Sequence, residues 1–292
     1  MKIRKAVIPA AGFGTRVLPA TKSMPKEMFP IIDKPTIQYV VEEAVNSGIE
    51  EILIVVSRGK EVISNHFDKS PELESILRKK NKLNLLEDIE YLSDRCNIFF
   101  CRQREAKGLG HAILCAKSFV GKEPFAVLYG DDVIISDIPV CKQLIDAFNK
   151  YNLGVVGAKE VDKDKIHKYG SLKVEHLEKN FFKCTDMVEK PTLDKIMSLY
   201  SILGRCILTP DIFDILEDTP PGVGGEIQLT DAMKYIARQK GMIMVDFEGK
   251  RYDMGNKLEI MKASVEIALT HPEIGNEFKN YLKDLDLSSD IL

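Results

Sequence analysis

The N-terminal part of the chain alternates short, almost wholly apolar runs with an amphipathic stretch. The apolar runs are Lys5–Pro9 (KAVIP) and Ile52–Val56 (ILIVV), and a glycine-punctuated loop follows the first. Between them, apolar residues recur at helical spacing from Ile37 to Val45, and Gly48 is a stop signal. Strands that are apolar along their whole length are buried on both faces, as in parallel sheets covered by helices. The order strand, loop, helix, strand therefore predicts an open α/β fold.

The pattern continues along the chain without an obvious linker. Strands are predicted at Asn97–Cys101 and Phe125–Tyr129, with a helix over about Gly110–Val120 between them, and the charged stretch Lys69–Asp94 has a helical period. Shorter, more alternating strands are predicted at Val155–Ala158, Ser171–Val174 and Phe181–Val188, and helices near Thr209–Glu217, Ile227–Gln239 and Lys257–Thr270. No stretch rich in Gly, Ser or Pro separates the two halves, so one unit over residues 1–292 is expected.

Composition excludes several classes of protein. Apolar residues are 45% and charged residues 29% of the 292 residues, so the chain can bury a core and is neither disordered nor fibrous. The net charge of −3 provides no general positive field, so no nucleic-acid partner is expected. No apolar run approaches the roughly 18 residues that span a bilayer, and no signal peptide is recognised. The six cysteines form no C-x-x-C pair, so we expect reduced thiols, a cytoplasmic location and no membrane partner.

The glycine-rich loop after the first strand is a candidate site. In Gly12-Phe13-Gly14 the third glycine of a dinucleotide fingerprint would fall at position 17, which is Val17, and the ending of a P-loop is absent as well. A Rossmann dehydrogenase and a Walker ATPase are therefore excluded. The backbone can still approach a phosphate closely, and Arg16, Lys22 and Lys26 add positive charge. An ordinary tight turn with solvated lysines is the alternative interpretation.

Two acidic residues, Asp131 and Asp132, follow the predicted strand Phe125–Tyr129. In open parallel sheets ligands bind at the carboxyl ends of the strands, so this pair and the glycine loop are expected to face one crevice. Adjacent residues on an extended segment point to opposite sides, so only one can readily serve a given metal. Mg²⁺ prefers one or two carboxylates with phosphate oxygens and water, which suits a metal–nucleoside triphosphate. The alternative is a turn or helix cap built by aspartate.

Polar groups at two other strand ends are also candidates. Gln103 precedes Lys107-Gly108-Leu109-Gly110, and its amide offers both a donor and an acceptor to a base edge. Because an amide can be turned either way, Gln103 alone does not distinguish uracil from cytosine. Glu189-Lys190-Pro191 ends a strand with paired charges. Taken alone, the first is typical of a loop surface and the second of a surface ion pair.

Long motifs in a fixed order resemble one family. Pro9–Met28 (PAAGFGTRVLPATKSMPKEM) resembles the signature loop of the sugar-nucleotide pyrophosphorylases, and specifically of the bacterial UTP-glucose-1-phosphate uridylyltransferases. Further matching motifs follow in order at Asp33–Tyr39, His66–Asp68, Arg102–Gln103, Lys107–Ala112, Asp186–Pro191, Gly225–Ala232 and Arg251–Asp253. The resemblance spans about residues 3 to 270.

The resemblance implies a fold and a reaction. The fold is a Rossmann-like α/β/α sandwich of the nucleotide-diphospho-sugar transferase type, with a mixed, mainly parallel central sheet. Its single domain has a nucleotide-binding part at about 1–135, a sugar-phosphate-binding part at about 136–255 and a C-terminal helical segment at about 256–292. The reaction is Mg²⁺-dependent: α-D-glucose 1-phosphate attacks the α-phosphorus of UTP in line, giving UDP-glucose and pyrophosphate. The implied assembly is a homodimer or homotetramer.

The resemblance also assigns roles to individual residues. The catalytic set is Arg16, Lys26, Asp131 and Lys190, of which the first two hold the β- and γ-phosphates and Lys190 meets the sugar phosphate. Asp131 and, as a second ligand, Asp253 hold Mg²⁺. The substrate-binding set is Ala10, Ala11, Gly12, Gly14, Glu27, Gln103, Gly108, Asp132, Gly170, Glu189 and Lys190. In that set Glu189 accepts hydrogen bonds from glucose hydroxyls, and Gln103 and Gly108 frame the uracil.

Two other functions stay open at this point. A thymidylyltransferase acting on glucose 1-phosphate would share the glycine loop and the metal aspartate, although Lys107–Ala112 and Gly225–Gln228 favour the uridylyl type. The other is a catalytically silent sugar-nucleotide-binding protein. Retention of the catalytic set Arg16, Lys26, Asp131 and Lys190 argues against a silent protein.

Overall fold

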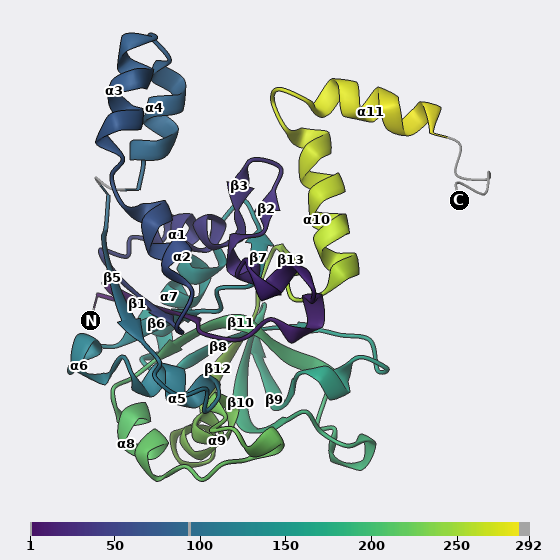
Figure 1. Ribbon diagram of the computed structural model, residues 1–292. Coiled ribbons are helices and arrows are strands. Elements are labelled where there is room, and N and C mark those ends of the chain that lie inside the picture. The colour runs from purple at the N-terminus through teal and green to yellow at the C-terminus, as the bar shows by residue number, and fades with distance from the viewer. Residues whose placement is uncertain (1, 93–94, 286–292) are drawn as a thin grey trace.

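The computed structural model describes residues 2–92 and 95–285, and it shows a central sheet with helices on both faces (Figure 1). The strands are β1 (Lys5–Ala10), β2 (Pro30–Ile31), β3 (Lys34–Pro35), β4 (Glu51–Val56), β5 (Asn97–Arg102), β6 (Phe125–Leu128), β7 (Asp132–Ile135), β8 (Val155–Glu160), β9 (Gly170–Glu178), β10 (Phe181–Glu189), β11 (Tyr200–Leu208), β12 (Met242–Asp246) and β13 (Lys250–Asp253). The helices are α1 (Thr36–Asn46), α2 (Glu61–Phe67), α3 (Pro71–Lys79), α4 (Leu83–Glu90), α5 (Leu109–Leu114), α6 (Lys117–Val120), α7 (Val140–Tyr151), α8 (Asp211–Asp218), α9 (Leu229–Lys240), α10 (Lys257–Thr270) and α11 (Gly275–Asp284). Residues 93–94 of the predicted charged helical stretch and residues 286–292 of the predicted C-terminal segment lie outside the described residues.

The first half of the main sheet is parallel. β1 pairs with β4 on one side and with β6 on the other, and β5 extends the sheet beyond β4, all in parallel. The carboxyl end of β1 at Ala10 therefore lies beside that of β4 at Val56. This is the arrangement predicted from the continuous apolar runs, and it puts the glycine loop at the strand ends where ligands bind in such sheets.

The second half of the sheet curls into a small closed barrel. β11 is antiparallel to β6 and β8, β10 is antiparallel to β12 and β9, and β12 is parallel to β8. β9 returns to β11 at Ser171 and Ser201, which closes the ring β11-β8-β12-β10-β9. The mixed sheet is confirmed, but a mainly parallel, Rossmann-like sheet is not. The long strands β9 and β10 are joined by only Lys179 and Asn180, and a two-residue connection fits antiparallel strands alone.

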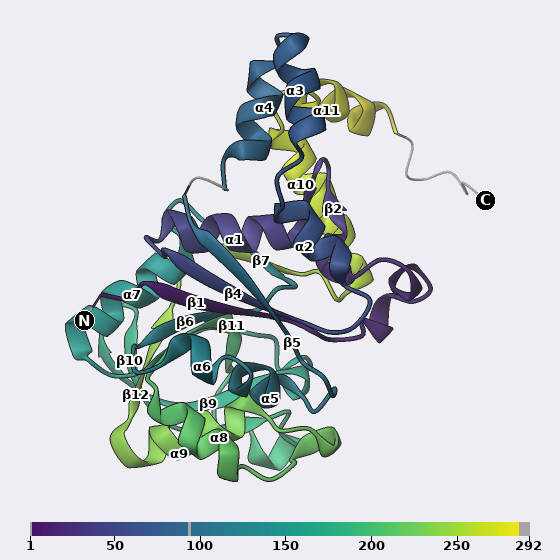
Figure 2. The ribbon, with the colours of Figure 1, turned by 60° about the vertical axis from the view of Figure 1, so that its left-hand side comes forward.

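Two apolar cores lie on opposite faces of the sheet. Because successive strand residues point to opposite faces, Ile8 belongs to the core shared with α1, α2 and α7, whereas Val7 belongs to the core shared with α5, α6, α8 and α9. Figure 2 shows these two groups of helices on either side of the sheet. The expected helix–sheet–helix layering is therefore present. The helix predicted over about Gly110–Val120 is divided into α5 and α6.

Two helical pairs stand away from the sandwich on the α1 side of the sheet (Figure 1, Figure 2). α3 and α4 form a hairpin, and α11 packs on α10. α10 is anchored on a third, small apolar cluster of Ile31, Val133, Tyr252, Met254 and Ala263. Over residues 2–92 and 95–285, no helix combines the length and the hydropathy needed to cross a membrane.

A buried ion pair joins α1 to the middle of the sheet. The side chains of Glu43 on α1 and Arg205 on β11 are only 7% and 1% exposed, and their Oε2 and Nη2 atoms are 2.7 Å apart. Arg205 Nη2 also donates to the Asp132 carbonyl at 2.8 Å, and Glu43 Oε1 accepts the backbone N–H of Cys141 at 2.9 Å. The pair thus fixes α1, α7, β11 and the backbone at Asp132 relative to one another.

Removing one member of this pair is expected to lower the stability of the fold strongly. Glu43→Ala leaves the Arg205 guanidinium buried without a counter-charge, so the free energy of unfolding should fall by about 3–5 kcal/mol, measured by urea denaturation. The control is Glu217→Ala, which removes an exposed partner of Lys117 and should cost about 1 kcal/mol or less. Equal losses in the two variants would contradict the structural role of the buried pair.

Candidate functional site

The loop after β1 begins with buried residues and continues into backbone that is exposed to solvent. Gly14 has φ of +67°, and a Cβ there would lie 2.9 Å from Thr21 Cγ2, so glycine is required. Thr21 Oγ1 donates to the Gly14 carbonyl at 2.8 Å, which folds the loop back on itself. Ala10 and Ala11 are buried, whereas Gly12 is exposed and an added Cβ there meets nothing within 4 Å. A ligand can therefore approach the backbone at Gly12.

Two cations and two carboxylates meet beside this loop. Arg16 donates to both carboxylate oxygens of Asp253, with Nη1–Oδ2 at 2.9 Å and Nη2–Oδ1 at 3.3 Å. Lys26, in the 3₁₀ helix Lys26–Met28, pairs with Asp131 through Nζ and Oδ2. Arg16 Nη2 lies 4.0 Å from Asp131 Oδ2 and so links the two pairs. The structure thus brings the predicted phosphate-binding cations and the predicted metal ligands into one cluster.

Pairing keeps this cluster charged although it is partly buried. Burial opposes ionisation of Asp131, but Lys26 together with Arg251 and Arg16 outweighs it and lowers the pKa of that carboxyl. Burial likewise opposes the charge on Lys26, and Asp131 together with Glu27 outweighs it and raises the pKa of the ammonium. Both groups are therefore ionised at neutral pH.

Asp132 occupies a different environment from its neighbour Asp131. Its side chain is 4% exposed, and its Oδ1 forms an ion pair with Arg251 Nη2 at 2.5 Å. Gly204 makes room for this carboxylate, because a Cβ there would lie 2.3 Å from Asp132 Oδ2. Burial raises the pKa of Asp132 to about 6. The predicted substrate-binding Asp132 thus contacts the protein interior, and its role stays a prediction.

A buried lysine that sequence reasoning missed supports the loop from behind. Lys60 Nζ donates to the Ala10 carbonyl at 2.6 Å and pairs with Glu27 Oε2 at 2.8 Å. Burial lowers the pKa of Lys60 and raises that of Glu27. The predicted substrate-binding residue Glu27, which follows Lys26 in the chain, is therefore held by Lys60. The position of Lys60 just after the predicted strand Ile52–Val56 was the signal that could have found it.

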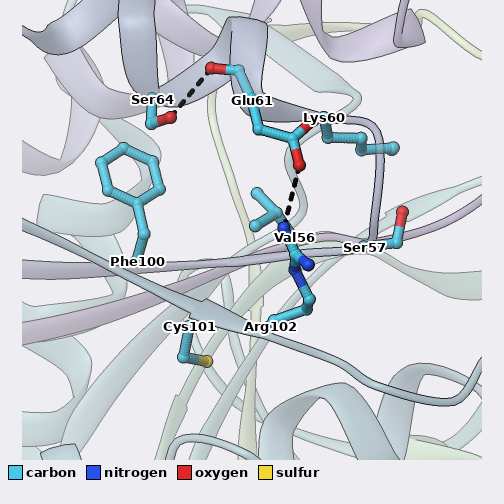
Figure 3. A pocket seen from close by; sticks show the side chains of 8 residues that line it. All are labelled: Val56, Ser57, Lys60, Glu61, Ser64, Phe100, Cys101 and Arg102. Atoms are coloured by element: carbon cyan, nitrogen blue, oxygen red, sulfur yellow. Dashed lines mark hydrogen bonds and ion pairs between the residues drawn. The ribbon is translucent and has the colours of Figure 1, made fainter.

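A cavity of about 220 Å³ lies between α2 and the ends of β4 and β5 (Figure 3). Lys60 and Ser64 line it from one side, and Phe100 lines it from β5. Glu61 and Arg102 form an ion pair across its edge at 2.8 Å. Of the two residues in the Arg102–Gln103 motif, Arg102 is therefore engaged with α2.

Gln103 is engaged with the loop that precedes α5. Its Nε2 lies 3.0 Å from the Gly108 carbonyl oxygen and 3.0 Å from His111 Nδ1. Gly108 has φ of +95°, and a Cβ there would lie 2.6 Å from Glu226 Cβ. Backbone hydrogen bonds of 2.8 Å from Ile227 to Lys107 and from Gly110 to Ile227 hold this loop against the Gly225–Ala232 motif. Two motifs that are far apart in the sequence therefore form one wall.

The residues predicted to bind the sugar phosphate lie together at the ends of β9 and β10, as a third group beside the charged cluster and the Gln103 wall. Gly170 and Glu189 are opposite each other in the β9–β10 ladder, and Glu189 Oε2 accepts from Thr230 Oγ1 at 2.7 Å. A Cβ at Gly170 would lie 3.4 Å from Glu189 Oε2, an ordinary contact distance, so Gly170 directly adjoins this carboxylate. Lys190 adopts φ of +42°, a backbone conformation that is uncommon for residues other than glycine and that concentrates at functional sites. Thr230 lies within the Gly225–Ala232 motif, but sequence reasoning gave it no role of its own.

Arg251 connects the sugar-binding group to the aspartate pair. It contacts Asp132, and its guanidinium lies 5.2 Å from the centre of the Tyr169 ring, with Nη1 3.4 Å from the Tyr169 hydroxyl. The Tyr169 carbonyl accepts the backbone N–H of Lys190 at 3.0 Å. The strands β7 and β13 also place Asp132 opposite Asp253. Sequence reasoning matched Arg251 within a motif without giving it this bridging role.

The carboxylates of this cluster suit a partly hydrated ion such as Mg²⁺ better than a metal ion whose ligands all come from the protein. Among the residues that the structure describes, no group of three or more His, Cys, Asp or Glu side chains could hold a metal ion. Asp131 and Asp253, which both lie within ion-pair distance of Arg16, offer hard oxygen donors. Mg²⁺ commonly binds one or two carboxylates and completes its shell with phosphate oxygens and water.

Comparisons with known proteins agree with one another. A family model described as Nucleotidyl transferase matches residues 5–269. A UTP–glucose-1-phosphate uridylyltransferase of Staphylococcus epidermidis is 50% identical over 286 residues, which is 98% of this chain and 99% of that protein. A crystal structure of UDP-glucose pyrophosphorylase complexed with UDP-glucose has a TM-score of 0.86 and 43% identity, covering 92% of this chain and 100% of that one. UTP-bound UGPase from Acinetobacter baumannii has a TM-score of 0.89 and 37% identity, covering 98% and 100%. This chain therefore belongs to the nucleotidyl transferase family and, within it, to the UTP-glucose-1-phosphate uridylyltransferases.

Proposed function

We propose that the chain transfers a uridylyl group from UTP to α-D-glucose 1-phosphate with Mg²⁺, giving UDP-glucose and pyrophosphate. The observation that carries the proposal is the cluster of Arg16, Lys26, Asp131 and Asp253 beside the glycine loop, in a chain whose near-full-length relatives bear that name. The sugar phosphate is already an anion at neutral pH, so no protein nucleophile is needed. The protein has to align two anions and offset their repulsion.

Arg16 and Lys26 supply the positive charge for the triphosphate. In the free protein both cations are paired with carboxylates, so an exchange of partners accompanies binding: the cations turn to the β- and γ-phosphates. They then stabilise the negative charge that grows on pyrophosphate as it leaves. Mg²⁺ held by Asp131 and Asp253 would neutralise phosphate charge and orient the triphosphate. Because the cations are present before binding, the site needs little reorganisation at the moment of reaction.

The sugar phosphate is assigned to the third group of residues. Lys190, with a half-exposed ammonium 3.7 Å from Glu189 Oε1, is suited to bind the phosphate. Glu189 can accept hydrogen bonds from glucose hydroxyls, since Thr230 uses only one of its oxygens. Arg251 and Tyr169 tie this group to the aspartates, so the attacking oxygen and the α-phosphorus are held in one frame. The proposed site residues run from Ala10 to Asp253, which supports a single catalytic unit rather than two independent domains.

A location and an assembly complete the proposal. All six cysteines are free thiols, which supports a reducing cytoplasm. Self-association into a homodimer or homotetramer is supported by exposed apolar side chains on the two projecting helical pairs, namely Leu73, Ile76, Leu83, Leu85 and Ile89 on α3–α4 and Leu258, Met261 and Leu269 on α10. Exposed apolar patches of this kind commonly mark protein interfaces.

The first test distinguishes a uridylyltransferase from a thymidylyltransferase and from a silent binding protein. Purified protein with Mg²⁺ and glucose 1-phosphate receives UTP or dTTP, and released pyrophosphate is measured. UTP should support the faster release. Much faster release with dTTP would favour the thymidylyltransferase, and no release with either would favour a silent binding protein.

The second test addresses the metal. Asp131→Asn keeps the size of the side chain but removes the charge that would hold Mg²⁺, so turnover should fall by several orders of magnitude at fixed Mg²⁺ while circular dichroism is unchanged. The matched control is Asp214→Asn, which changes an aspartate that is 82% exposed and should leave turnover unaltered. Near-normal turnover of the Asp131 variant would remove Asp131 from this role.

The third test addresses the assembly. Light scattering of the wild-type chain should give two or four times the mass of one chain. The double variant Ile76→Glu, Leu85→Glu puts charge on the α3–α4 hairpin and should reduce that mass, because unpaired charges are expensive to bury in an interface. Leu193→Glu, at a leucine that is 73% exposed and lies in neither projecting pair, serves as the control. A monomeric wild-type protein would rule out the proposed assembly.

A further inference from the structure

Both N–H groups of the Gln103 amide have acceptors within the protein. One acceptor is the Gly108 carbonyl oxygen and the other is His111 Nδ1, each 3.0 Å from Nε2. The amide oxygen Oε1 accepts no hydrogen bond from residues 2–92 or 95–285, and it is not among the buried polar atoms that lack a partner. Oε1 is therefore the part of this amide that remains accessible to a ligand.

The orientation of the amide follows from its surroundings. A backbone carbonyl can only accept, so turning the amide over would set Oε1 against the Gly108 oxygen. His111 completes the arrangement if its Nδ1 carries no proton, which is the case in the neutral tautomer protonated at Nε2. Burial and the nearby Lys107 lower the pKa of His111, which favours the neutral ring. The contacts of Ile227 with Lys107 and Gly110 hold both acceptors in place.

We propose that His111 is a positioning residue that sets the choice of pyrimidine base by fixing the Gln103 amide with only its oxygen directed to the base. This inference rests on the proposed function, in which Gln103 lies at the nucleobase. Uracil and thymine carry an N–H at ring position 3 that can donate to Oε1. Cytosine carries a lone pair at that position, so two acceptors would face each other. The site therefore selects UTP, and equally dTTP, against CTP.

The experiment compares three nucleotides on five proteins. Wild type, His111→Phe, His111→Leu, His111→Asn and His66→Phe are checked for folding by thermal melting. For each, kcat/KM for pyrophosphate release and, by calorimetry, the dissociation constant are measured with UTP, CTP and dTTP. His66 is the matched control, because it pairs with Gln38 at 2.9 Å between α2 and α1 and contacts none of the proposed base-binding residues.

The expected result is a change in selectivity rather than in activity alone. The phenylalanine and leucine variants lose the acceptor, so the preference for UTP over CTP should fall about tenfold or more, out of the roughly 10⁴-fold that a hydrogen-bonding site can reach. His111→Asn keeps an acceptor oxygen and should retain most of the preference. The ratio of dTTP to UTP should not change in any variant, and His66→Phe should behave as wild type.

Two results would overturn the inference. One is an unchanged preference for UTP over CTP in folded His111→Phe and His111→Leu proteins. The other is an equal loss with UTP, CTP and dTTP, which would mean that His111 acts only on stability or on general binding. Absence of pyrophosphate release by the wild type would instead refute the proposed function, and the dissociation constants would still decide the role of His111.

Discussion

The buried pair of Glu43 and Arg205 is the interaction on which the arrangement of the molecule depends. Arg205 lies in the central strand β11, where the parallel half of the sheet meets the barrel, and its other hydrogen bonds go to the carbonyls of Gly204 and Asp132. Glu43 reaches it from α1 and also accepts the backbone N–H of Cys141 in the first turn of α7. Desolvating two charges is expensive unless every donor and acceptor is matched, so the pair tolerates only one relative placement of these elements. The backbone that carries the aspartates is positioned as a result.

The proposed site also contains paired opposite charges, although they are less buried than Glu43 and Arg205. Arg16 with Asp253 and Lys26 with Asp131 are neutral as pairs, so two cations that an anion could bind add nothing to the net charge of the chain, which is −3. Side-chain exposure differs between the two ends: Arg16 is 60% exposed, whereas Asp253 is 7% exposed. The cation can therefore leave for a phosphate at little cost in solvation, while the carboxylate stays in place. This asymmetry suits the Arg16 pair to exchange its internal partner for a ligand, whereas Lys26 and Asp131 are similarly exposed, at 14% and 20%.

Strands and helices with a clear local sequence pattern could be predicted, whereas contacts between residues far apart in the chain could not. β1, β4 and α1 have continuous apolar runs or a helical period, and they were predicted close to their observed ends. β11 was missed because Gly204 and Arg205 interrupt its apolar run, and Arg205 is compatible with a core strand only through Glu43, 162 positions away. The resemblance indicated which residues matter at the site, but not their contacts. Arg16 and Asp253 are 237 positions apart, and Lys60 and Asp132 owe their surroundings to the folded chain alone.

Gln103 shows what contacts add to a list of residues. A glutamine amide is ambiguous as a reader of bases, because its oxygen and nitrogen are similar in size and can exchange places. The ambiguity is resolved by groups that never touch the base: the Gly108 carbonyl oxygen and the His111 ring occupy both N–H groups of the amide. These groups are themselves held by the backbone of Ile227, which lies in the motif that also supplies Thr230 to Glu189. One segment of chain thus supports both the wall of the proposed base site and the proposed sugar site, so the two specificities share a single rigid frame.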